Sequence, residues 1–234
     1  MAAIGEGYDL FSVVKGSTML DLEPLFPGIG IVYSNGIPID PDRTGNFSTG
    51  LVRKGWLPEN ESGTIPIEMF AEHSVSTTPV PLAPFGLGDG VAELHTIINA
   101  GGLLTGLPST DGAVRPSTGV MGIWRTFSGG GRFELMLNIN PLIVLTRVGG
   151  SVRDLGGPDV ITTFDGSGLL NPVGAIGGQW STISPRTRSF TDERFSPGGF
   201  YAATDRALHV PVSVQLTSGG LGATRLVQCA VHME

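Results

Sequence analysis

The clearest pattern in the chain is an alternation of apolar and polar positions near its C-terminal end. Across residues 207–217 nearly every second residue is a large apolar one, which is the two-residue period of a strand with one buried face. Small residues at 218–222 predict a turn, and a second apolar-patterned segment follows. Folding back about this turn sets Val214 opposite Val227. A one-residue slip would bring polar residues onto the apolar face, so the pattern predicts this register.

A second alternation covers residues 64–75 and predicts another half-buried strand. Its polar face is marked by Glu68, Glu72 and Ser74, and Phe70 is the exception to the alternation. Its apolar face consists of Ile65, Ile67, Met69, Ala71, His73 and Val75.

Turn residues predict two further hairpins. The first covers residues 30–39, with the Asn35-Gly36 pair at its tip. The second joins residues 120–127 to 132–139 through the glycine-rich segment 128–131. Other apolar runs predict strands at 8–14, 49–52, 91–99 and 142–148, with weaker patterns at 160–164, 179–183 and 200–203.

These segments together predict an all-β fold. They amount to about eleven to thirteen strands at the spacing typical of sandwiches and barrels, and no window has the 3.6-residue period of a helix. We expect an antiparallel β-sandwich, either jelly-roll or Ig-like, with little helix. We expect residues 1–234 to form a single domain, because strands 91–99 and 120–127 could pair across the loop 101–118. A subdivision near that loop is the alternative.

Composition restricts the classes of function. The 234 residues include 36 Gly and 17 Pro, are 40% hydrophobic and only 15% charged, and carry a net charge of −7. This composition argues against disorder, and the absence of a basic cluster argues against binding nucleic acid or an anionic membrane surface. No apolar run reaches the roughly 18 residues of a membrane span. The first residues lack the pattern of a signal peptide. The compartment stays open between the cytoplasm, secretion or surface display after removal of a leader, and a virion.

The segment that begins at Asp40 resembles the first half of a calcium loop. Asp40, Asp42 and Thr44 are oxygen-bearing residues at alternate positions, as calcium requires, and Gly45 would allow the sharp turn; Asn46 completes the candidate set. The residue at the twelfth position is Leu rather than Glu, and the same residue types also form ordinary turns. Ca²⁺ is therefore the one cofactor that the sequence suggests, with a plain turn as the alternative.

Histidines suggest a weaker metal site. The predicted C-terminal register places His209 opposite His232, with Cβ atoms about 5 Å apart. A transition metal needs at least a third ligand, and His95 is the candidate. His95 shares a strand face with Glu93. An exposed histidine pair that binds nothing is the competing interpretation.

The sequence offers little for nucleophilic catalysis. There is no Gly-x-Ser-x-Gly motif, and the single cysteine, Cys229, falls on the predicted apolar face, where we expect a buried thiol. Trp56, Trp124 and Trp180 could form a sugar-stacking platform, although core packing explains them as well.

The sequence is compatible with three functions. It favours the first, in which the protein is not an enzyme. This is a structural β-sandwich that self-assembles as a homo-oligomer or polymer, in a surface layer, filament, extracellular matrix or viral shell. The second is a carbohydrate-binding or calcium-stabilised adhesion module. The third is a metal-dependent jelly-roll enzyme that uses His95, His209 and His232.

Overall fold

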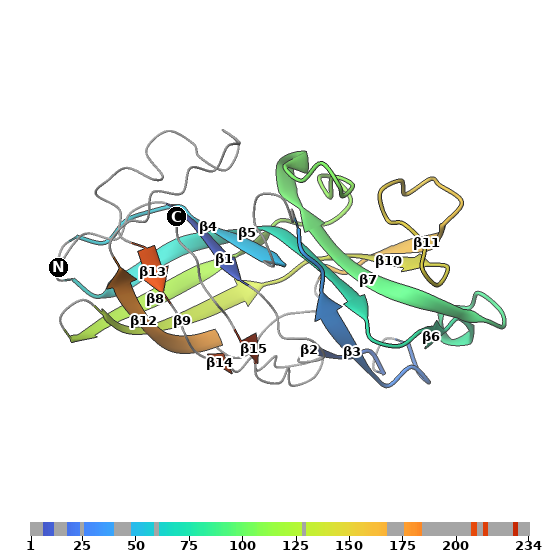
Figure 1. Cartoon of the computed structure of the whole chain (residues 1–234), viewed down its shortest axis with the longest axis horizontal. Helices are drawn as coiled ribbons and strands as arrows, with labels where there is room; N and C mark the ends of the chain where they lie inside the picture. The colour runs from blue at the N-terminus through green and yellow to red at the C-terminus, as the bar shows by residue number, and fades with distance from the viewer. Residues whose placement is uncertain are drawn as a thin grey trace.

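The structure is a computed structural model, and it confirms the all-β class and the antiparallel pairing. It describes residues 7–11, 18–23, 26–39, 48–58, 61–127, 130–167, 176–183, 207–209, 213–214 and 227–228. Within these residues the only helices are two short 3-10 turns, η1 (Ala83–Phe85) and η2 (Ala100–Gly102). The strands form a large antiparallel sheet that curls into a half-barrel (Figure 1). The jelly-roll or Ig-like sandwich stays a prediction.

Most strands up to residue 165 lie within a few residues of predicted segments, but the strands at 18–21 and 80–81 have no predicted counterpart. The strands are β1 (Gly7–Phe11), β2 (Thr18–Asp21), β3 (Ile31–Gly36), β4 (Thr49–Arg53), β5 (Gly63–Ser76), β6 (Val80–Pro81), β7 (Val91–Asn99), β8 (Ser117–Phe127), β9 (Gly130–Asn138), β10 (Leu142–Thr146), β11 (Val160–Asp165), β12 (Ile176–Ile183), β13 (Ala207–His209), β14 (Ser213–Val214) and β15 (Val227–Gln228).

The longest strand, β5, organises the sheet. Glu68 of β5 pairs with β4 on one edge and with β8 on the other, whereas Ser74 pairs with β3 and with β7. Strands β3 and β4 therefore lie end to end along one edge of β5, and β7 and β8 lie end to end along the other. Next to them, β9 pairs with β8 and β10 pairs with β7, so these two strands are also in line.

A row of strand breaks crosses the sheet, and we call it the seam. It consists of Ile37 and Ser48, where the chain leaves β3 and enters β4, Asn99 and Ser117, which end β7 and begin β8, and Asn140 between β9 and β10. On β5 the row passes beside His73, whose C=O accepts a hydrogen bond from Ile37 N–H and whose N–H donates to Ser48 O. Strand β5 itself crosses the seam without a break (Figure 1).

Buried polar side chains satisfy the backbone groups that the strand breaks release. The Asn99 amide donates to Leu104 O and Leu107 O, each at 3.0 Å, and its Oδ1 accepts from Leu104 N–H at 2.9 Å. Asn140 N–H donates to Ser117 Oγ at 2.8 Å. Because an unpaired buried backbone group costs free energy, these side chains let the chain leave the sheet at the seam and return to it.

Phe70 interrupts the alternation of β5 because it is a bulge residue. The register between β4 and β5 shifts at this point, so that Gly50 pairs with Ala71 and Leu51 with Met69. A Cβ atom at Gly50 would come within 2.4 Å of the Phe70 ring, so the absence of a side chain at Gly50 allows that ring to be buried.

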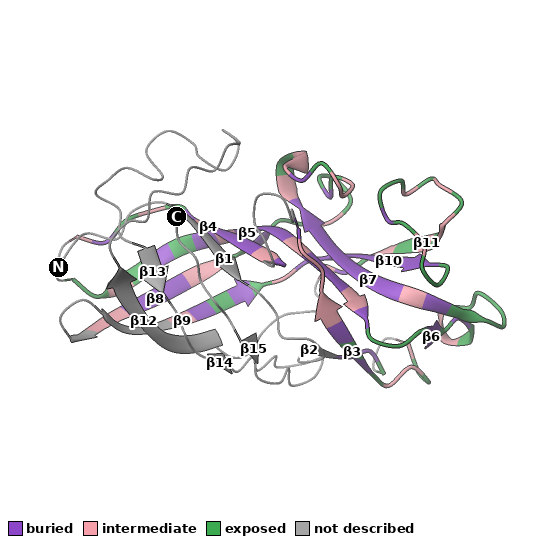
Figure 2. Cartoon of the chain, in the orientation of Figure 1, coloured by how far each residue is buried: buried purple, intermediate pink, exposed green. Residues whose placement is uncertain are grey.

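Two apolar clusters cover opposite faces of the sheet on the β7–β10 side of the seam. One includes Leu94 and Leu145 and extends to Leu20 and Leu82. The other includes Ile97 and Val144 and extends to Val152 in the segment after β10. Buried residues therefore run along most of β7 and β10 (Figure 2).

Several sequence predictions of pairing have clear outcomes. The β8–β9 hairpin is confirmed. The hairpin with Asn35-Gly36 at its tip is wrong, because Asn35 and Gly36 belong to β3 and pair with Val75 and Ser74. This long-range pairing outweighs the local turn signal. The predicted pairing of 91–99 with 120–127 is also wrong, since β7 and β8 are in line rather than side by side.

The predicted C-terminal register is confirmed where the chain is described. Ser213 pairs with Gln228 and Val214 pairs with Val227. The pairing of His209 with His232, the burial of Cys229 and the segment 200–203 lie outside the described residues or concern side chains that are not described. No helix in the described part of the chain has the length and apolar character needed to cross a membrane.

Candidate functional site

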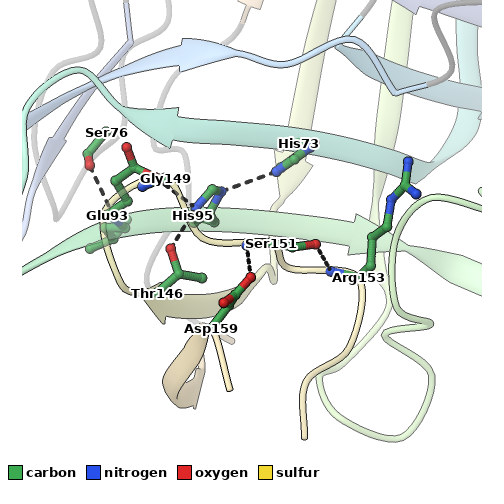
Figure 3. Close-up of polar contacts among 10 residues, drawn as sticks. His73, Ser76, Glu93, His95, Thr146, Gly149, Ser151, Arg153 and Asp159 are labelled. Atoms are coloured by element: carbon green, nitrogen blue, oxygen red, sulfur yellow. Dashed lines mark hydrogen bonds and ion pairs between the residues drawn. The ribbon is translucent and has the colours of Figure 1, made fainter. Parts of the chain in front are cut away.

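Two buried histidines meet on one face of the sheet next to the seam. Val75 pairs with His95 across β5 and β7, so His73 and His95 lie diagonally on the same face. His73 Nε2 is 3.3 Å from His95 Nδ1, and the two rings stack with centroids 5.5 Å apart. The side chains are 8% and 6% exposed (Figure 3).

Polar groups of the neighbouring strand and turn extend this pair. His95 Nε2 is 3.2 Å from the hydroxyl of Thr146, which β10 supplies. Glu93, also on β7, places Oε2 3.9 Å from His95 Nε2, and the same oxygen accepts a hydrogen bond from Gly149 N–H at 3.0 Å. Glu93 thus joins the histidine pair to the turn that follows β10 (Figure 3).

Burial keeps both imidazoles neutral at neutral pH. Burial, followed by the nearby His95, lowers the pKa of His73 to about 3. Burial also lowers the pKa of His95, against the opposing effect of Glu93. A neutral imidazole has one N–H donor and one acceptor nitrogen, which suits a relay from Thr146 through His95 to His73.

A second buried polar group lies on the opposite face of the same two strands. Thr96 Oγ1 donates to Glu72 Oε1 at 3.0 Å, and Ser74 Oγ lies 2.5 Å from Thr96 Oγ1. Glu72 Oε2 is buried and has no hydrogen-bond partner among the described residues. Burial raises the pKa of the Glu72 carboxyl to about 8, against the lowering effect of its hydrogen bonds with Ser74 and Thr96.

An exposed polar loop covers the histidine face. Asp159 accepts hydrogen bonds from Ser151 N–H at 2.8 Å (Figure 3) and from Arg147 Nε at 2.5 Å, and these contacts close residues 147–159 into a compact turn. The Ser151 N–H, followed by Arg147, lowers the pKa of Asp159. Val152 from this loop packs on the apolar cluster beside the histidines.

Burial limits the chemistry that these groups can perform. A Thr–His pair resembles an activated nucleophile, but Thr146 is 0% exposed, and no surface is available where a substrate could meet its hydroxyl. Among the described residues, no group of three or more His, Cys, Asp or Glu side chains is arranged to hold a metal ion. Both polar clusters supply hydrogen bonds between neighbouring strands of the sheet.

The predicted site residues fall in different parts of the chain. The candidate calcium ligands Asp40, Asp42, Thr44 and Asn46 lie outside the described residues, as does His232. The backbone of His209 belongs to β13, which pairs with β12 at the opposite end of the strand order from β10 and β11. His95 and Glu93 share a strand face, as the sequence predicts.

Sequence reasoning missed His73, Glu72 and Thr146 as members of these clusters. The sequence pattern places His73 on the apolar face of its strand. A second histidine on a neighbouring apolar strand, His95, is the feature that could have indicated a buried histidine pair. The sequence pattern places Glu72 on the polar face of its strand, and only the pairing with β7 brings it to Thr96.

Comparison with known proteins identifies no relative of this chain. No family model, curated protein or solved structure matches the chain. The fold and the two clusters define it only as an all-β protein with an open antiparallel sheet.

Proposed function

We propose that the chain is a non-catalytic structural protein that self-assembles into a layer, filament, matrix or shell. The observation that carries the proposal is the open sheet. Within the described residues the strand order ends at β11 and β13, and β1 and β2 each pair along one edge only. Sheet edges bind further strands unless the protein covers or charges them, and assembly is one way to satisfy them.

Exposed apolar side chains on several strands support the proposal. Ile31 and Tyr33 on β3 are 53% and 40% exposed, and Met136 on β9 is 56% exposed. Single exposed apolar residues are common on any protein, so they add contact area to an edge interface rather than define one.

The buried clusters favour a structural role over an enzymatic one. The His73, His95 and Thr146 side chains are buried, and so is the Oε2 atom of Glu72, which supports a role in the fold rather than contact with a substrate. The net charge of −7 opposes close approach of copies at low salt, so assembly should strengthen as ionic strength screens that repulsion.

Light scattering coupled to size-exclusion chromatography tests the proposal. We expect species heavier than the 24.4 kDa monomer, a mass that rises with protein concentration and salt, and ordered particles in negative-stain micrographs. A single 24.4 kDa species at every concentration and salt would overturn self-assembly.

A further inference from the structure

Strand β11 is the sheet edge that the structure describes most completely. It pairs with β10 along one side, and no other strand in the described part of the chain pairs with its outer side. Both of its faces are partly covered. Phe164 packs with Phe26 and Phe85 on one face, and Val160 joins the cluster of Ile97 and Val144 on the other. The outer edge is therefore the part of β11 that is left for a partner.

Strand β11 has few of the usual devices that protect an edge: its register with β10 shifts at Ile161, and the residues from Thr162 to Phe164 have no such device. It reads VITTFD, with no Lys and no Pro, and its single charge is at the last residue, Asp165. Natural edge strands are commonly blunted by Lys, Pro or inward-pointing charges. The β-branched and aromatic residues of β11 instead favour strand pairing.

We propose that β11 pairs antiparallel with β11 of a second copy, with Thr163 opposite Thr163 of that copy. The inference rests on the proposed self-assembly and names the surface that performs it. A two-fold axis perpendicular to the sheet gives such an isologous contact, and it sets residues of the same face opposite one another.

Charge selects this register over its nearest alternative. Centring the pair on Thr162 would bring Asp165 toward Asp159, which lies just before β11 and beyond the register shift at Ile161, and like charges close together destabilise a strand pair. Centring it on Thr163 sets Asp165 opposite Ile161 and Phe164 opposite Thr162. The second register therefore has no like-charge pair within β11.

A lysine at the centre of the contact tests the edge. Thr163 is exposed, so we expect Thr163→Lys to leave the melting temperature and circular dichroism spectrum close to those of the wild type. It would place two lysines opposite each other and should weaken self-association by about fivefold or more. The matched control is Thr118→Lys, because Thr118 is also exposed but pairs with Glu68 and Asn138 on its two sides.

A cysteine at the same position tests the register. In a Cys229→Ser background, Thr163→Cys should form a disulfide-linked dimer under mild oxidation, since directly opposite residues bring their Cα atoms within about 4.5–5.5 Å. Thr118→Cys should remain unlinked under the same conditions.

The outcomes separate this inference from the function on which it rests. If the wild type assembles, but Thr163→Lys assembles as tightly as Thr118→Lys and Thr163→Cys does not cross-link, the β11 contact is wrong and self-assembly stands. If the wild type is a monomer throughout and Thr163→Cys does not cross-link, both are overturned. A cross-link at position 163 together with weakened association of Thr163→Lys supports both.

Discussion

At the scale of single residues, Glu72 and His73 are neighbours in the chain that face opposite sides of the sheet and titrate in opposite senses. Burial raises the pKa of the Glu72 carboxyl to about 8 and lowers the pKa of the His73 imidazole to about 3. Both side chains are therefore mostly neutral near pH 7. Each makes the free energy of unfolding depend on pH, because its pKa differs between the folded and unfolded chains.

Glu72 should destabilise the fold as pH rises. Its folded pKa of about 8 exceeds the ordinary value of 4.5, so its contribution is fully present below pH 4.5 and is lost as pH rises toward 8. The loss should approach about 1.4 kcal/mol per pH unit. We expect Glu72→Gln to remove this slope in urea unfolding series between about pH 5 and 8. Identical slopes in the variant and the wild type would contradict the burial of a protonated carboxyl.

His73 should destabilise the fold as pH falls. Its folded pKa of about 3 is below the ordinary value of 6.5, so its contribution is present above pH 6.5 and is lost as pH falls toward 3. We expect His73→Gln to reduce the acid-side loss of stability by up to about 1.4 kcal/mol per pH unit. Val144→Ala is the control, since it should lower stability at every pH without changing the slope. An unchanged acid slope in His73→Gln would exclude His73 as the titrating group.

At the scale of elements, the strands with a local signal were predictable and the connections between them were not. The alternation of residues 64–75 predicts β5, and the glycine-rich turn predicts the β8–β9 hairpin. Both patterns involve only residues that are close together in the sequence. The incorrect Asn35-Gly36 hairpin shows the limit. Its turn signal is local, whereas the pairing of β3 with β5 depends on residues about 40 positions away.

The candidate site shows the same limit. The spacing of Glu93 and His95 on one strand predicts that they share a face, and in the structure Glu93 Oε2 lies 3.9 Å from His95 Nε2. The contact of His73 with His95 depends on the register between β5 and β7, which no local pattern contains. The hydrogen bond between Glu72 and Thr96 depends on the same register.

The seam depends on Asn99, and its amide can be tested directly. Asn99→Ala would leave Leu104 N–H and the carbonyls of Leu104 and Leu107 without this partner. Buried groups left unpaired cost about 1–3 kcal/mol each, so we expect a loss of at least about 2 kcal/mol in unfolding free energy. Asn138→Ala, at an exposed position of β9, should cost less than about 0.5 kcal/mol. Equal costs for the two variants would mean that the Asn99 contacts do not hold the seam.

At the scale of the whole molecule, the two halves of the sheet meet at the seam, and long connections leave the sheet there. Gly101 and Gly102 have φ of 68° and 61°, a conformation that glycine adopts easily, and they turn the chain away from β7. Residues 103–116 then run outside the strands before β8 begins in line with β7.

This connection should tolerate extra residues. We expect about ten Gly and Ser residues inserted between Gly112 and Ala113, which are both exposed, to lower the unfolding free energy by less than about 1 kcal/mol, because loop-closure entropy grows slowly with length. The same insertion after Pro66 would break the pairing of β5 with β8 and should prevent cooperative unfolding. Loss of folding in the first variant would show that the connection is a required part of the sheet.

The unbroken path of β5 also has a mechanical consequence. When tension is applied along the strands, the backbone of β5 carries it straight across the seam, whereas the 100–116 connection turns away from the sheet and crosses by a longer path. Each half is stiffened by its own ladder of hydrogen bonds. The sheet should therefore bend at the seam, where β5 and the short segment between β9 and β10 are the parts of the chain that cross it most directly.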